Sequence, residues 1–220
     1  MIKTRTASKW IVLASCVLLI VSTSNVLANE GNLKRSVEGY SDSALSCFAL
    51  AFQAGKRYGV PVGVEIDKRT TDKTTTVHFK TGTVADLFSA IVAQMPGYTW
   101  AEDGGVVNIM PIDHEDTILD VKIARFEVKK LNQFELPSAI SSTPEVKAWL
   151  ARNGLTERTP MGGIFPGPSK HGPSQRSVSV NLHDVTVRYV LNYIVRKSEW
   201  TDWSVRRYGD NNEYINIYIN

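Results

Sequence analysis

The chain has little cysteine, which argues against a disulfide-stabilised scaffold. Two cysteines occur among its 220 residues, and Cys16 lies within an N-terminal apolar segment. Cys47 is therefore the single thiol of residues 29–220, and one thiol cannot form an internal disulfide. It stands in an apolar stretch, which favours a buried small hydrophobic residue over a reactive thiol. Stability must then come from an apolar core.

Excess charge is also missing once the N-terminus is set aside. Residues 1–28 hold Lys3, Arg5 and Lys9 and no carboxylate. Because the chain has 25 Lys and Arg residues and 22 Asp and Glu residues, residues 29–220 balance at 22 of each sign. Such neutrality argues against non-specific nucleic-acid binding, which needs a clustered cationic surface. A hydrophobic fraction of 43% and a charged fraction of 21% are typical of a globular protein.

Beyond the N-terminus there is no apolar run of membrane-spanning length, so no integral span is expected after residue 28. The cationic start, the apolar run over residues 10–21 and the small residue Ala28 predict a signal peptide over residues 1–28, cleaved after Ala28. An uncleaved anchor helix is one alternative. Lipid attachment at Cys16 is another, disfavoured because the apolar run continues beyond that residue. The protein is therefore expected to be exported.

Recognisable catalytic motifs are absent from the sequence. It contains no nucleophile-elbow, phosphate-loop or dinucleotide pattern, and its four histidines, His78, His114, His171 and His183, lack metal-ligand spacing. The acidic run 113–116 around His114 is better explained as a solvated linker than as a metal site. We therefore predict no enzyme activity, no cofactor and no metal.

What the sequence does contain is an internal similarity at an offset of 103 residues. Residues 77–100 align with residues 180–203 without a gap. Six positions are identical: Val77/Val180, Thr83/Thr186, Val84/Val187, Ile91/Ile194, Val92/Val195 and Trp100/Trp203.

In both copies the pattern predicts a strand that leads into a helix. Apolar residues alternate up to Thr83 or Thr186, each placed to cap the helix that follows. The helices carry one apolar stripe each, at positions 84, 87, 88, 91 and 92 and at positions 187, 190, 191, 194 and 195. A hairpin is expected to follow in each copy, over residues 98–102 and 106–110 and over residues 201–206 and 214–219.

Further helices and strands are predicted ahead of each copy. Leu45, Phe48, Ala49 and Phe52 share a helical face, and residues 62–66 follow as a strand. Before the second copy we expect a strand over 118–128, a turn or short helix near 134–141, and a helix capped by the Thr143 hydroxyl.

The expected fold class is α+β, with two related small units, each of helices packed on a short mixed or antiparallel sheet. Residues 29–112 would form the first domain, residues 113–117 a linker and residues 118–220 the second, divergent domain. Residues 160–173 are rich in glycine and proline and would form an insertion in the second domain.

The first unit resembles the secretin and TonB short N-terminal (STN) domain family. The resemblance rests on residues 77–88, on the aromatic segment 98–100 and on the hairpin 103–109; it covers about residues 43–111, with a fainter version over 123–219. It implies periplasmic domains that contact partner proteins and are not catalytic. With no length left for a pore, the chain would be a free-standing tandem of two such units.

Two groups of residues are candidates for contacts with other molecules. Ile164 and Phe165 stand in the insertion and would serve as apolar docking residues, unless the insertion is simply a surface loop. Trp100 and Trp203 are expected to be core anchors rather than a ligand-stacking platform.

The favoured function is an exported, non-enzymatic interaction module of the bacterial envelope that docks to or senses an outer-membrane channel or receptor. Its partner would be an unidentified envelope protein, contacted through edge strands and loops. The alternative is a small periplasmic ligand-binding protein or hydrolase that uses a cleft between the units.

Overall fold

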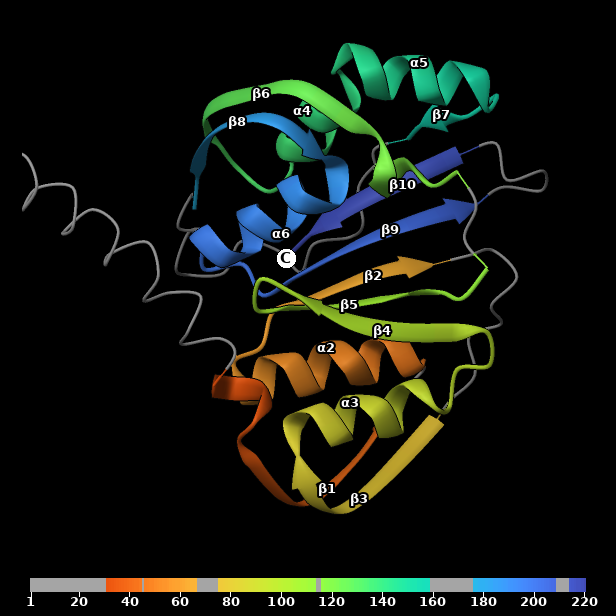
Figure 1. The fold of residues 1–220 in the computed structure, drawn as a ribbon, viewed down its shortest axis with the longest axis vertical. Coiled ribbons are helices and arrows are strands. Elements are labelled where there is room, and N and C mark those ends of the chain that lie inside the picture. The colour runs from red at the N-terminus through yellow and green to blue at the C-terminus, as the bar shows by residue number, and fades with distance from the viewer. Residues whose placement is uncertain (1–30, 45, 67–74, 114–115, 159–175, 209–213) are drawn as a thin grey trace, which may run out of the picture.

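The computed structural model describes residues 31–44, 46–66, 75–113, 116–158, 176–208 and 214–220 (Figure 1). The expected α+β class is confirmed, since helices and mixed or antiparallel sheets are both present. The predicted leader, His114, His171, the predicted insertion 160–173 and its docking residues Ile164 and Phe165 lie outside the described residues.

The described part of the first half contains both helices and strands. In chain order they are β1 (Ser36–Ala44), α2 (Cys47–Tyr58), β2 (Val62–Ile66), β3 (Thr75–Thr83), α3 (Val84–Val92), β4 (Tyr98–Asp103) and β5 (Val106–Pro111). β1 and β3 form an antiparallel pair, and α2 and α3 lie between that pair and a larger sheet (Figure 1).

The second half follows a similar order. After the 3₁₀ turn η1 (Ile118–Asp120) come β6 (Lys122–Leu131), α4 (Leu136–Ser141), α5 (Pro144–Arg152), β7 (Thr156–Glu157), β8 (Val178–Thr186), α6 (Val187–Lys197), β9 (Asp202–Tyr208) and β10 (Tyr214–Ile219). β6 pairs antiparallel with β8, as β1 does with β3. β7 runs parallel to β10, as β2 does to β5.

One six-stranded sheet draws three strands from each half, in the order β4-β5-β2-β9-β10-β7. The halves meet where β2 pairs in parallel with β9, with Val62 opposite Asp202 and Ile66 opposite Arg206. β4 and β7 are the outer strands of this sheet within the described part of the chain.

The two stripes predicted from the repeat are buried. All five stripe residues of α3 and all five of α6 belong to the core. The hydroxyls of Thr83 and Thr186 accept hydrogen bonds from the amides of Asp86 and Tyr189, so both predicted caps are confirmed. Asp86 completes a capping box, and its hydrogen bonds with Thr83 hold the pKa of its carboxyl below the ordinary value.

Two details of the predicted helices are wrong. α2 buries Cys47, Leu50, Ala51 and Ala54, whereas Ala49 and Phe52 of the predicted face are only partly buried, because the helix packs against both α3 and β1. The Thr143 hydroxyl does not cap α5; it donates to the Ile140 carbonyl at 2.9 Å instead.

The end of the predicted linker is held firmly. The Asp116 carboxylate accepts hydrogen bonds from Trp149 Nε1 at 2.8 Å, from Arg152 and from Asn153. These bonds, led by that of Trp149, lower the pKa of Asp116. Thr117 is buried beside it. Thr117 therefore joins the core of the second half, whereas Asp116 stays exposed and is tied to α5 by these bonds.

Candidate protein-binding edge

The outer side of β4 is a candidate binding edge. β4 pairs with β5 so that Trp100 lies opposite Ile109 and Ala101 opposite Asn108. The Ile112 amide bonds the Gly97 carbonyl at 2.8 Å, and bonded pairs alternate along an antiparallel ladder. By this alternation the backbone groups of Trp100 and Glu102 point away from β5, where no described strand receives them. Such a row of donors and acceptors can pair with another chain.

Trp100 lies at the centre of this edge. Its indole Nε1 donates to the Ser89 hydroxyl at 3.2 Å, and its ring is 6.1 Å from that of Phe88 in α3. The second half contains the matching contact, since Trp203 Nε1 donates to Asn192 Oδ1 at 2.9 Å. Trp203 is fully buried, whereas Trp100 is only half-buried. Trp203 therefore has the core position that was expected for both tryptophans, whereas Trp100 is only partly in the core.

The difference between the two tryptophans comes from β2. Gly63 of β2 lies opposite Trp203, and a Cβ at position 63 would approach the indole to 2.1 Å. Glycine is therefore the residue that lets β2 lie close over this ring. In the described residues no strand lies over Trp100 in the same way.

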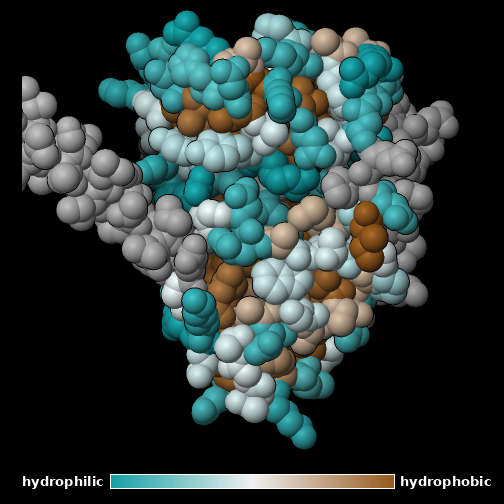
Figure 2. All heavy atoms as spheres, viewed as in Figure 1, coloured by the Kyte–Doolittle hydropathy of each residue, from teal (hydrophilic) through white to brown (hydrophobic). Residues whose placement is uncertain are grey.

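A hollow of about 350 Å³ lies beside the β4 edge. It is lined by Leu33, Lys34, Thr83, Ala85 and Glu102. The carboxylate of Glu102 accepts a hydrogen bond from the Gly105 amide, which fixes the hairpin turn. On the face drawn in Figure 2, neutral and apolar residues gather around β4 and α3, and a further apolar group shows among the hydrophilic residues near β6 and β8. The edge therefore combines backbone groups, an aromatic ring and a hollow.

Polar contacts from α6 fasten the junction between the halves. The buried Asn192 amide donates to Asp103 Oδ2 at 3.0 Å, and Arg196 donates to the Gly104 carbonyl at 3.0 Å. These two bonds hold the β4–β5 turn against the second half.

A partly buried ion pair crosses the same junction. Glu65 Oε2 of β2 lies 3.7 Å from Arg188 Nη2 at the start of α6, and each side chain is 14% exposed. Arg188 also reaches Asp120 at 3.4 Å, and Glu65 bonds the Thr117 hydroxyl.

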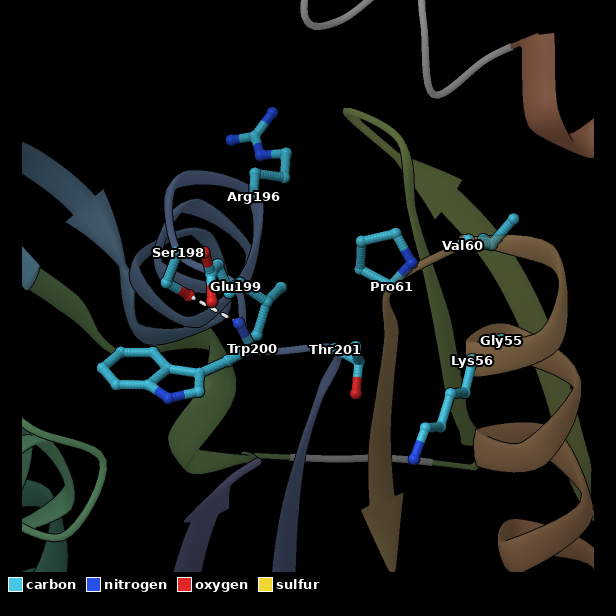
Figure 3. A pocket seen from close by; sticks show the side chains of 11 residues that line it. Gly55, Lys56, Val60, Pro61, Arg196, Ser198, Glu199, Trp200 and Thr201 are labelled. Atoms are coloured by element: carbon cyan, nitrogen blue, oxygen red, sulfur yellow. Dashed lines mark hydrogen bonds between the residues drawn. The ribbon is translucent and has the colours of Figure 1, made fainter. Parts of the chain in front are cut away.

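A second hollow, of about 270 Å³, lies between the halves (Figure 3). Pro61 and Lys56 line one side, and Arg196 and Glu199 the other. Figure 3 shows the Arg196 and Lys56 side chains at opposite ends of the hollow, away from each other. The polar groups do not converge on one point, as a catalytic or small-ligand site would require.

A third hollow, of about 540 Å³, lies on the sheet beside Arg206, Tyr208 and Tyr218. Burial raises the pKa of the Tyr218 hydroxyl. Ser204, Asn216 and Asn220 also line this hollow, and its described lining places no acidic or histidine side chain beside the serine to act as a general base.

The described histidines do not gather at any of these places. His78 is exposed on β3, with Nδ1 2.9 Å from the Ser41 hydroxyl, and His183 is exposed on β8. In the described ranges, no group of three or more His, Cys, Asp or Glu side chains is arranged to hold a metal ion.

Three important residues were not singled out from the sequence. Ser89 and Asn192 occupy equivalent positions at the offset of 103, and each bonds the tryptophan eleven residues later. The shared spacing of eleven residues before a tryptophan could have identified both residues from the sequence. Gly63 carried no comparable signal, because its importance depends on which strand lies opposite it.

No helix in the described ranges is both long and apolar enough to cross a bilayer. Comparison with known proteins finds no matching family model, no matching curated protein and no matching solved structure.

Proposed function

We propose that the protein is an exported, non-enzymatic interaction module of the bacterial envelope, and that it docks to a partner protein through the β4 edge. The observation that carries the proposal is the contrast between two equivalent tryptophans. Trp203 is covered by a strand, and Trp100 is left half-buried on an outer strand. An edge that exposes backbone groups and an aromatic ring is suited to strand addition.

The envelope location rests on the sequence. Residues 1–28 have the charge and apolar pattern of a signal peptide. The resemblance to STN domains adds a specific setting, namely a tandem of two related units near an outer-membrane channel or receptor. The parallel order of elements in the two halves and the matching caps at Thr83 and Thr186 support such a tandem.

The ligand-binding or hydrolase alternative would use the hollow between the halves. Arg196 on its wall is already engaged with the Gly104 carbonyl. Lys56 of α2 and Glu199, which follows α6, are exposed and line it from opposite sides. The polar side chains of this hollow are therefore engaged or spread apart. This arrangement favours the interaction module over a ligand-binding protein or a hydrolase.

Site-specific photocrosslinking in the cell of origin tests the proposal. A photoreactive amino acid replaces the exposed Ala101 on β4, and a control protein carries it at the exposed Lys147 on α5. We expect one envelope protein to be crosslinked from position 101 and not from position 147. Crosslinks from neither position, or equally from both, would reject docking through this edge. Mass analysis of the mature N-terminus tests export separately, with a start at Asn29 expected.

A further inference from the structure

We propose that β4 binds its partner as a parallel strand, with a glycine of the partner placed opposite Trp100. The partner segment would have the chemistry of β2, which is a β-branched residue, glycine, a second β-branched residue and then a carboxylate. This inference rests on the proposed function and specifies what the β4 edge recognises.

The chain itself shows how such an edge is covered. β2 runs parallel to β9 over five paired positions, with Gly63 opposite Trp203 and Glu65 opposite Val205. The Val62 amide donates to the Thr201 carbonyl at 3.1 Å. The bond between the Asp202 amide and the Asn220 carbonyl sets the alternation, so that Trp203 and Val205 turn their backbone groups toward β2.

β4 presents the same arrangement, and none of the strands that the structure describes occupies its outer side. At the offset of 103, Trp100 and Glu102 correspond to Trp203 and Val205, and their backbone groups also point to the outer side of the strand. The indole is held in both halves by the same type of bond to the preceding helix. An incoming strand in the β2 register would meet donors and acceptors at the same spacing.

The hollow beside β4 lies where that strand would place its fourth residue. Where β2 covers β9, the Glu65 side chain of β2 lies 3.7 Å from Arg188 of α6. The residue equivalent to Arg188 in the first half is Ala85, which lines the hollow together with Lys34. The shorter alanine leaves space, and Lys34 supplies a cation for an incoming carboxylate. Glu102 also lines the hollow, but its carboxylate is engaged by the Gly105 amide. The hollow thus matches the side chain that the β2 pattern would insert.

A second copy of this chain cannot supply the strand from β2, because β2 is enclosed between β5 and β9. The described part of the opposite edge, β7, is only two residues long. Since neither of these described strands of a second copy fits the edge, we assign it to a different polypeptide with an extended glycine-containing segment.

The probe is a synthetic peptide with the sequence of residues 60–66, Val-Pro-Val-Gly-Val-Glu-Ile. It is titrated into isotope-labelled protein while the indole N–H resonances are followed by NMR, which detects weak binding. The Trp100→Phe variant assigns the Trp100 signal. We expect that signal to shift saturably, and the Trp203 signal, which β2 already covers, to stay in place.

Two matched pairs test the register and the backbone pairing. A peptide with valine in place of glycine should bind at least about tenfold more weakly, because its side chain would meet the indole. In the protein, Glu102→Pro removes a backbone donor on the outer side of β4 and should weaken binding at least about fivefold. Glu102→Ala removes the same carboxylate but keeps the donor, and should bind within about twofold of the original protein.

Several results would overturn the inference. They are the absence of any Trp100 shift, equal binding of the glycine and valine peptides, equal effects of Glu102→Pro and Glu102→Ala, or a shift of Trp203 that signals displacement of β2. Peptide-induced dimerisation, measured by sedimentation, would also contradict it. If crosslinking from position 101 succeeds while the peptide fails, the docking function stands and only the parallel glycine register is wrong.

Discussion

Gly63 and Trp203 are opposite one another in neighbouring parallel strands, and the indole of Trp203 fills the space that a side chain at position 63 would need. This contact joins the two halves of the chain at the centre of the six-stranded sheet. Since Trp203 is fully buried, the junction is part of the core rather than a loose contact between separate bodies.

Replacing Gly63 with alanine should destabilise the protein strongly. A Cβ at this position would lie 2.1 Å from Trp203 Cζ2, so the strand or the ring must move. We expect a loss of about 2–3 kcal/mol in the free energy of unfolding, measured by chemical denaturation. Gly31→Ala is the control, because position 31 has no atom within 4 Å of an added Cβ. Equal stability of the two variants would contradict the packing described.

Asn192 is expected to contribute more to stability than its counterpart Ser89. Its amide accepts from Trp203 Nε1 and donates to Asp103, so Asn192→Leu leaves the buried indole N–H without a partner. The expected loss is about 2 kcal/mol. Ser89→Ala removes the equivalent bond at an exposed site and should cost less than about 1 kcal/mol. Thermal or denaturant unfolding of both variants decides whether the two positions differ as stated.

The ion pair of Arg188 with Glu65 should stabilise the junction between the halves. Arg188→Met would leave the Glu65 carboxylate, 14% exposed, facing an apolar side chain. A loss of about 2 kcal/mol is expected by denaturant unfolding at neutral pH. Arg125→Met is the matched control, because the Arg125–Glu127 pair is exposed and such pairs contribute about 0.5 kcal/mol or less. A larger effect at Arg125 than at Arg188 would reverse this assignment.

The Asp202 carboxyl should lower the stability of the folded protein as the pH rises from acid toward neutral, which is the opposite of what most carboxyls do. Burial raises its pKa above the ordinary 3.8, although bonds from Asn220 and Thr201 oppose the shift. Between 3.8 and the raised pKa the folded protein binds more protons than the unfolded chain, so this group's contribution falls as pH rises. Asp202→Asn should therefore be more stable than the original protein at neutral pH.

The pH dependence of that difference provides the check. The advantage of Asp202→Asn should shrink as the pH falls through the raised pKa of the folded state and level off below 3.8, where the original carboxyl is protonated in both states. Denaturant unfolding across this range measures it. An advantage that grows with acidity would show that the carboxyl has a lowered pKa instead.

The local elements of the repeat could be predicted because their signals lie within a few residues. Thr83 and Thr186 cap their helices through bonds three residues away, and the α3 and α6 stripes follow helical spacing. β1 was missed because it contains Gly39 and several polar residues, and only Val37 and Tyr40 of it are buried. Its strand conformation depends on pairing with β3, distant in sequence.

The candidate edge could not be predicted in the same way. The duplication pointed to Trp100 and Trp203 as equivalent residues, but their different surroundings depend on β2 crossing to β9. Pairing between strands far apart in the chain is decided by the three-dimensional packing, and no local pattern at Gly63 or Asp202 encodes it. The insertion residues Ile164 and Phe165 stay a prediction, since they lie outside the described residues.

The place of β2 between β5 and β9 also has a consequence for biosynthesis. During translation, β2 leaves the ribosome long before β9 and β10, which are the last strands of the chain. Until they arrive, β2 and β4 are both edge strands among those described in the first half, and the nascent chain is exposed to unwanted association. A chain truncated before Asp202 should therefore aggregate. A chaperone or export factor bound to the nascent chain would protect these strands until synthesis ends.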